Sequence, residues 1–252
     1  MTSFAAITSM NSHYYNHSGK VMLKSYSEYF DSNVPLYVYN EDATQFKIKN
    51  ITSMPWQLGN EYTKFQKRWA SNSKVRGFSK KAFSIIHAMN NIDCDRLIWL
   101  DADTIVTRNV LLQLLELISP DDVLSTHYGV IHPWPSETNN DRTAFSCETG
   151  FFILNKRHAS FDKFKETYTD IYINDRVENI RRFYDGEVYG ETVRLLSQGG
   201  AKMMDLNPGN IHKTPIPRSI LAPYISHSKA GLKDTINYTE LEKLLDEKSK
   251  SI

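Results

Sequence analysis

The sequence predicts an α/β protein in which helices flank a mixed, mostly parallel β-sheet, and its opening segments carry this prediction. Residues 4–10 form a short apolar run typical of a buried strand, residues 21–30 place apolar side chains at helical spacing, and residues 35–39 form a second apolar run. A strand, a helix and a strand in that order indicate a βαβ unit, whose two strands are parallel.

The composition agrees with a folded protein. The 252 residues include 12% aromatic side chains, and the formal net charge is +1. Disordered chains have few aromatic residues and a large charge imbalance, and nucleic-acid coat proteins are strongly basic, so both classes are excluded. A chain of this length buries a substantial core. Because no linker divides it, we expect a single domain over residues 1–252.

The first half contains three further signals. Residues 11–12 and 16–19 have turn chemistry, and Ser79 is a candidate cap for an amphipathic helix that ends at Asn90 and Asn91. Residues 96–100 form an apolar strand, and Asn109 is a candidate cap for a helix that reaches residue 118.

The second half is expected to be more irregular. Asp185 is a candidate cap for the helix at 187–197. We expect strands at residues 123–128, 144–154, 201–206 and 224–226, helices at residues 161–173, 187–197 and 238–248, and a Pro-rich loop at residues 207–223.

Cysteine use and the N-terminus indicate a cytoplasmic location. Cys94 and Cys147 are too few for a disulfide framework, so we interpret them as reduced thiols. The N-terminus lacks the basic start and apolar stretch of a signal peptide. No apolar run approaches the ~18 residues that a membrane span needs. We therefore expect a cytoplasmic protein without a membrane span.

The segment LIWLDAD, residues 97–103, carries the strongest functional signal, because an apolar strand ends in two carboxylates. Alternate residues of an extended chain point to the same side, so we expect Asp101 and Asp103 to converge on one ligand. Open α/β sheets bind ligands at the carboxyl ends of their strands. Two carboxylates suit Mg²⁺ or Mn²⁺, which would neutralise a nucleoside diphosphate and assist its departure.

The segment LIWLDADTIV resembles the Asp-x-Asp segment of GT-A-fold, nucleotide-sugar-dependent glycosyltransferases, and is most similar to the family that includes glycogenin and the bacterial lipooligosaccharide galactosyltransferases. The resemblance implies one GT-A-type domain, with a Rossmann-like nucleotide-binding half at residues 1–108 and an acceptor half at residues 109–252. It also implies that Asp103 is the main metal ligand and that Asp101 contacts the metal or the ribose.

The family has a third metal ligand, a His in a His-x-x-Gly-x-x-Lys segment near the C-terminus. Residues 227–233, HSKAGLK, are similar, with the Gly one position later. By this resemblance His227 completes the metal site. Lys229 or Lys233 would meet the diphosphate as a positive charge.

The resemblance also assigns the donor. The first strand of such folds holds the nucleoside, and Tyr14 is a candidate for stacking on the base. The helix before the Asp-x-Asp strand supplies a basic residue that contacts the donor. For this role Lys80 is preferred over Arg76 and Lys81. The candidate donor-binding residues beyond the metal ligands are Thr8, Ser9, Tyr14, Asn40, Arg76 and Lys80.

Two later segments bear on catalysis. The segment CETG, residues 147–150, resembles the family's Asn-Ala-Gly strand beneath the transferred sugar and places Glu148 there. The segment DGE, residues 185–187, resembles the Asp-Gln-Asp segment that opens a helix near the anomeric carbon, with Gly186 in place of Gln. Asp185 or Glu187 is a candidate general base for the acceptor hydroxyl. Capping of that helix is the alternative role for both carboxylates.

The sequence therefore predicts a metal-dependent glycosyltransferase, a hexosyltransferase that uses a nucleoside-diphosphate sugar, most simply a uridine-linked one. The acceptor is a glycan, a lipid, a protein or a modified nucleic acid. One alternative is a haloacid-dehalogenase-like phosphohydrolase in which Asp101 attacks phosphate and Asp103 is the acid/base. The other is a non-catalytic nucleic-acid-binding protein that uses residues 64–81, a basic stretch without acidic residues and interleaved with aromatic ones.

Overall fold

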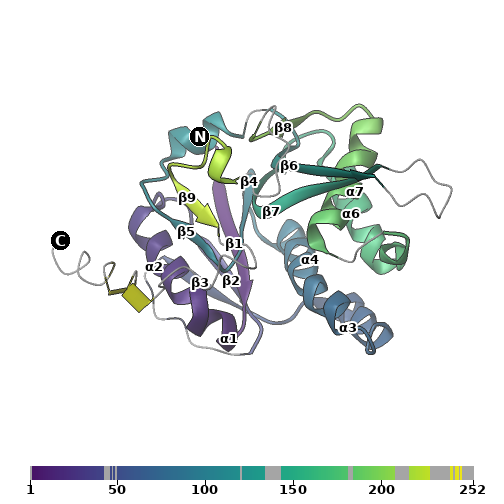
Figure 1. Cartoon of the computed structure of the whole chain (residues 1–252), viewed down its shortest axis with the longest axis horizontal. Helices are drawn as coiled ribbons and strands as arrows, with labels where there is room; N and C mark the ends of the chain where they lie inside the picture. Colours follow the sequence, from purple (N-terminus) through teal and green to yellow (C-terminus); the bar gives the residue numbers. More distant parts are fainter. Residues whose placement is uncertain are drawn as a thin grey trace.

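A computed structural model describes residues 2–42, 46, 48, 50–119, 121–133, 143–180, 184–207, 216–227, 239–240, 242–243 and 245. In these residues, seven strands form one sheet in the order β3-β2-β1-β4-β7-β6-β8, and a two-stranded sheet joins β5 to β9. Figure 1 shows the larger sheet edge-on, with helices on both of its faces.

The first four strands of the large sheet are parallel. They are β1 (Phe4–Met10), β2 (Leu36–Asn40), β3 (Ile51–Pro55) and β4 (Arg96–Leu100). The direction reverses at β7 (Thr143–Asn155), which pairs antiparallel with β4 and with β6 (Leu124–Pro133). At the far edge, β8 (Met203–Asp205) pairs parallel with β6. The predicted mixed, mostly parallel sheet is thus confirmed.

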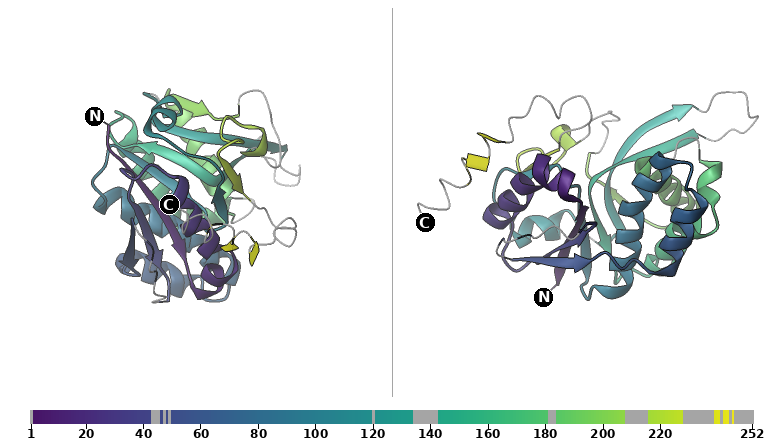
Figure 2. Two further views of the ribbon diagram at one scale, coloured as in Figure 1. Left: turned by 90° about the vertical axis from the view of Figure 1, so that its left-hand side faces the viewer. Right: turned by 90° about the horizontal axis from the view of Figure 1, so that it is seen from below.

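The central strands β1 and β4 are mostly apolar and almost entirely buried because both of their faces are covered. In β1, Ala5 and Ile7 pack into the core on one side of the sheet, whereas Phe4, Ala6 and Met10 pack into the core on the other. The first core is shared with α3 (Gly59–Arg68), α4 (Ser73–Asn91), α6 (Phe161–Ile173) and α7 (Asp185–Gln198), and the second with α2 (Lys20–Tyr29) and α5 (Leu112–Leu117). The two views of Figure 2 show these helical layers on opposite sides of the sheet.

The predicted caps Ser79 and Asn109 are wrong, and so is the predicted turn chemistry at residues 11–19, because other residues cap these helices. Residues 11–19 are helical rather than turns: Asn11 Oδ1 accepts from the N–H of Tyr14 at 2.9 Å and caps α1 (Ser12–Tyr14), which continues through the π-helix η1 (Tyr15–Gly19) into α2. Helix α4 starts at Ser73 under the cap Asn72, so Ser79 lies inside it. Helix α5 starts at Leu112, whose N–H donates to Asp31 Oδ2 at 3.3 Å.

Other differences follow from weak local patterns. Strand β3 has mostly exposed or half-buried residues and helix α3 buries only Phe65, so neither presents a strong periodic signal. Strand β5 (Thr104–Val106) follows Asp103 directly and pairs antiparallel with β9 (Ile225–His227). By contrast, β1, β4 and α6 have the predicted bounds. The predicted helix at 238–248 falls largely outside the described residues.

Two short 3-10 turns complete the described fold, η3 (Arg176–Asn179) and η4 (Ile216–Arg218). Residues near the end of the chain lie against the helical layer that contains α2: Lys24 Nζ on α2 lies 3.0 Å from Glu242 Oε1, and Leu245 packs against Val21 and Ile105. Among the described residues, no helix combines the length and the apolar character that crossing a bilayer needs.

Candidate metal and nucleotide site

Asp101 and Asp103 lie in a tight loop between β4 and β5. The N–H of Asp101 donates to the carbonyl of Gly150 at 3.0 Å, and the N–H of Thr104 donates to the carbonyl of Asp101 at 2.9 Å, which closes a turn at residues 102–103. Ser18 in η1 donates to the carbonyl of Ala102 at 3.0 Å. The two carboxylates converge because the chain turns here, and not because it continues as an extended strand.

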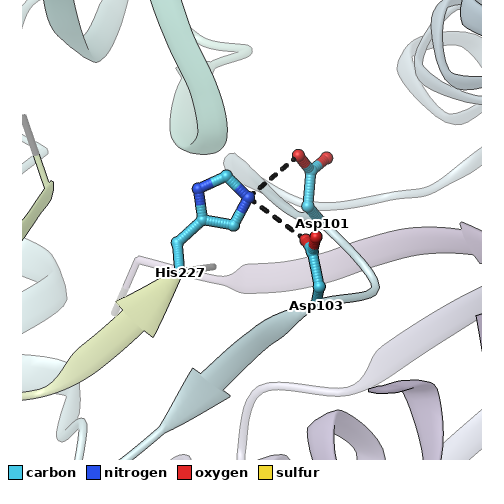
Figure 3. Close-up of side chains that lie close together, drawn as sticks. All are labelled: Asp101, Asp103 and His227. Carbon is cyan, nitrogen blue, oxygen red and sulfur yellow. Dashed lines mark ion pairs between the residues drawn. The ribbon is translucent and has the colours of Figure 1, made fainter. Parts of the chain in front are cut away.

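His227 reaches the same point from the opposite end of the chain. Strand β9 pairs with β5 so that His227 stands opposite Thr104. His227 Nε2 lies 3.1 Å from Asp103 Oδ1 and 3.5 Å from Asp101 Oδ2, as Figure 3 shows. One ligand atom from each of the three residues lies within 4.8 Å of the others. Two carboxylate oxygens and one imidazole nitrogen, at the carboxyl end of β4, form a donor set that fits Mn²⁺ or Mg²⁺.

The electrostatics of His227 follow from this packing. Burial alone would lower the pKa of His227, but hydrogen bonds to Asp101 and Asp103 and the nearby charge of Glu148 raise it to about 10. Burial would likewise raise the pKa of Asp101, yet Lys81 and His227 hold it well below its usual range. The imidazole therefore carries a proton between the carboxylates, and a metal ion must displace that proton to bind Nε2.

Lys81, and not the preferred Lys80, is the basic residue of α4 that contacts Asp101. Its ammonium lies 2.6 Å from Asp101 Oδ1 and 2.8 Å from Asp185 Oδ2, donates to the carbonyl of Thr149 at 2.7 Å, and lies 5.1 Å from the centre of the Trp99 ring. Burial would lower the pKa of Lys81, but the two carboxylates hold it above its usual range.

A signal for this role was present in the sequence. Lys81 lies three residues after Phe78 and four before Ile85 on the apolar face of α4, and a lysine on a buried face needs a paired charge. The preferred Lys80 instead pairs with Glu41 at 2.6 Å.

A cavity of about 230 Å³ opens beside these carboxylates at the carboxyl ends of β1, β2 and β4. It is lined by Ser9, Tyr14, Glu41, Gly77, Phe78, Lys80, Lys81, Trp99, Asp101, Ala102, Asp103 and Asp185. The predicted donor residues Ser9, Tyr14, Lys80 and Asp101 thus share one wall, together with the unpredicted Glu41.

The other predicted donor residues lie elsewhere in the described structure. Thr8 is fully buried in β1, and the Asn40 amide donates to Ser53 Oγ at 3.4 Å. The Arg76 guanidinium donates to Gln66 Oε1 at 3.0 Å. Lys229 and Lys233 lie outside the described residues.

The three candidate catalytic carboxylates are separated by the fold. Asp185 is the first residue of α7 rather than its cap, and its carboxylate accepts from Thr149 Oγ1 at 2.7 Å and meets Lys81 in the cavity wall. Glu187 is buried in the first turn of α7. Glu148 is buried on β7, with Oε1 3.5 Å from His227 Nδ1.

Gly186 explains the departure from the resembled Asp-Gln-Asp segment. A Cβ atom at this position would lie 2.5 Å from the carbonyl oxygen of Cys147, so α7 approaches β7 too closely for any side chain here. A glutamine at position 186 would require the helix or the strand to move.

Four of the seven cations in the basic stretch at residues 64–81 form ion pairs within the described part of the protein. Lys64 pairs with Glu61 at 2.6 Å and Arg68 with Asp175 at 2.7 Å, and Lys80 and Lys81 pair with the acidic residues described above. A surface that tracks a phosphate backbone needs unpaired cations. This pattern therefore favours a structural and site-forming role for the stretch.

The fold is shared with solved sugar transferases. A galactosyltransferase, LgtC, solved with donor and acceptor sugar analogues, matches with a TM-score of 0.56 at 15% identity over 95% of each chain. Mouse xyloside xylosyltransferase 1 matches with a TM-score of 0.52 at 13% identity over 81% of this chain and 85% of that one. The glycosyltransferase GlyE of Streptococcus pneumoniae matches with a TM-score of 0.53 at 12% identity over 99% of this chain and 64% of that one.

These likenesses show that the chain has the GT-A-type fold, as the sequence predicts. No protein-family model matches the sequence, and a search of curated proteins finds no match.

Proposed function

We propose that the protein is a metal-dependent glycosyltransferase that moves a hexose from a uridine-diphosphate sugar to an acceptor hydroxyl. The observation that carries the proposal is the convergence of Asp101, Asp103 and His227 within 4.8 Å at the edge of a cavity at the strand ends. Sharing the GT-A-type fold with sugar transferases supports it but does not by itself define an activity.

Asp101, Asp103 and His227 would hold Mn²⁺ or Mg²⁺. When bound, the ion supplies positive charge that stabilises the diphosphate as a leaving group. The nucleoside would extend toward the ends of β1 and β2, where Ser9 and Tyr14 line the cavity and Tyr14, a residue that is 44% exposed, could stack on the base. Residues 1–108 would then bind the donor, and residues 109–252 would supply His227 and bind the acceptor.

Lys81 and Asp185 would act beside the metal, where the transferred sugar would lie. Lys81 ties Asp101 to Asp185 and so fixes both carboxylates relative to each other. Asp185 is the one candidate catalytic carboxylate among the cavity-lining residues that the structure describes. We assign Asp185 as the general base for the acceptor hydroxyl. The hydroxyl oxygen bonds to the anomeric carbon, the bond from that carbon to the phosphate oxygen breaks, and the hydroxyl proton passes to Asp185.

The phosphohydrolase alternative fits Asp101 less well. Asp101 Oδ1 accepts hydrogen bonds from Lys81 at 2.6 Å and from the Trp99 indole at 2.7 Å, and Asp101 Oδ2 faces His227. A carboxylate held in this way suits metal ligation better than attack on phosphorus.

The acceptor is a glycan, a lipid, a protein or a modified nucleic acid, each of which presents a hydroxyl.

Release of UDP from a panel of UDP-sugars, with and without Mn²⁺, tests this proposal. We expect metal-dependent release from one sugar donor, which an acceptor accelerates, and loss of the release in Asp103→Asn. Release that is equal in Asp103→Asn and the parent protein would contradict it. Activity on a simple phosphate ester without nucleotide release would favour the phosphohydrolase.

A further inference from the structure

Glu148 faces the side of the His227 ring that points away from the Asp101 and Asp103 carboxylates. His227 Nε2 is directed at those two carboxylates, while His227 Nδ1 lies 3.5 Å from Glu148 Oε1. The side chains of Glu148 and His227 are 6% and 8% exposed, so both are removed from solvent. The imidazole therefore lies between metal-binding carboxylates on one side and a separate buried carboxylate on the other.

The backbone of β7 holds this carboxylate in place. The N–H of Gly150 donates to Glu148 Oε1 at 3.1 Å, two residues along the same strand. Gly150 also provides room for the imidazole, since a Cβ there would lie 2.7 Å from ring atoms of His227. Glu148 and Gly150 together hold the ring of His227, which comes from β9, in one position.

We propose that Glu148 is a positioning residue that makes His227 a metal ligand and biases the site toward Mn²⁺ over Mg²⁺; the inference rests on the proposed metal-dependent function. A neutral imidazole binds metal through one nitrogen and carries its proton on the other. A carboxylate that accepts the Nδ1 proton fixes this tautomer, fixes the ring orientation and makes Nε2 a stronger donor.

The choice of metal follows from the donor atoms. Mg²⁺ is bound mainly by oxygen ligands and keeps several waters, whereas Mn²⁺ accepts a nitrogen ligand more readily than Mg²⁺ does, so Mn²⁺ gains more from a strengthened imidazole. The catalytic assignment of Glu148 is then unnecessary, because its carboxylate acts through His227 and not on the sugar.

The test is titration of the full chain with Mn²⁺ alone and with Mg²⁺ alone, followed by calorimetry, in three variants. Glu148→Met removes the acceptor at similar size, and we expect Mn²⁺ affinity to fall about 10- to 100-fold with a smaller change for Mg²⁺. Glu148→Gln keeps a carbonyl acceptor, so it should rescue much of the loss. Glu166→Gln removes an exposed carboxylate on α6, outside the site, and we expect it to leave Mn²⁺ affinity unchanged.

A purely structural role would lower both metal affinities by the same factor, in step with the melting temperature. Equal losses for Mn²⁺ and Mg²⁺, or no loss in Glu148→Met while the parent protein binds Mn²⁺, would overturn the inference and leave the metal site standing. A parent protein that binds neither metal would overturn the proposed function itself, and the inference with it.

Discussion

The two ends of the cavity are built in different ways. At the metal end, ion pairs of 2.6 to 3.5 Å link five buried or half-buried residues, Asp101, Asp103, Lys81, Asp185 and His227. At the nucleoside end, Tyr14 is 44% exposed, and Lys80, whose side chain is 35% exposed, pairs with Glu41. The difference indicates that the metal end is preorganised by charge, whereas the nucleoside end is open to the ligand.

The largest effect is expected from Asp103→Asn. Asp103 supplies one of the three converging ligand atoms, so its loss should reduce Mn²⁺ affinity by roughly a hundredfold or more, as loss of a direct ligand exceeds the 10- to 100-fold of an outer partner. Electron paramagnetic resonance of free Mn²⁺ measures this. Asp162→Asn, on the exposed side of α6, is the control, and equal affinities in the two variants would contradict the assignment.

Substitution of neighbouring lysines compares the two ends directly. Lys81→Met leaves Asp101 and Asp185 facing each other without their shared cation, and breaking a buried pair costs about 3 kcal/mol of unfolding free energy. Lys80→Met breaks a partly exposed pair, for which solvent screening limits the cost to about 1 kcal/mol or less. Urea unfolding measures both, and equal losses would show that the metal end is not preorganised as described.

Two glycines give the same comparison without changing charge. Gly150→Ala forces a Cβ against the His227 ring, and we expect Mn²⁺ affinity to fall about tenfold or more as the ring is displaced. At Gly77 in α4, a Cβ meets no heavy atom of the described residues within 4 Å. Gly77→Ala should therefore leave Mn²⁺ affinity unchanged and stabilise the helix by up to about 1 kcal/mol. Unchanged metal affinity in Gly150→Ala would show that the close packing of Gly150 against the His227 ring is not needed for metal binding.

The smallest effect is expected from Tyr14→Ala. Stacking of a base on an aromatic ring contributes about 1–3 kcal/mol, so UDP affinity in the presence of Mn²⁺ should fall about tenfold. Mn²⁺ affinity in the absence of nucleotide should not change, because Tyr14 supplies none of the three converging ligand atoms. Competition binding with a fluorescent nucleotide measures the first quantity. An unchanged UDP affinity would show that the base does not stack on Tyr14.

The sequence predicts the metal end better than the nucleoside end, for physical reasons. Asp101 and Asp103 follow a continuous apolar strand whose residues pack on both faces. Their position at the end of this strand could therefore be predicted from residues 96–104. The turn at residues 102–103 that brings the two carboxylates together could not, and neither could the pairing of β5 with β9 that places His227 opposite Thr104. That pairing joins segments more than one hundred residues apart, which no local pattern reports.

The exchange of Lys80 for Lys81 shows a second limit. Adjacent lysines on a helix point about 100° apart, so one residue decides whether the ammonium lies in the buried network or beside Glu41. Glu41 joins the cavity wall because its N–H donates to the carbonyl of Met10 at 3.1 Å and extends the pairing of β1 with β2. Helix α4 and the strand register thus set the positions of residues that composition and spacing leave equivalent.

Calorimetric titration of the protein with UDP, with and without Mn²⁺, tests the central claim most directly. The preorganised metal end predicts that UDP binds tightly only when Mn²⁺ is present, since the carboxylates of Asp101 and Asp103 repel an unaccompanied diphosphate. UDP binding of equal strength in the presence of a chelator would contradict the account, because the converging carboxylates and His227 would then have no part in holding the nucleotide.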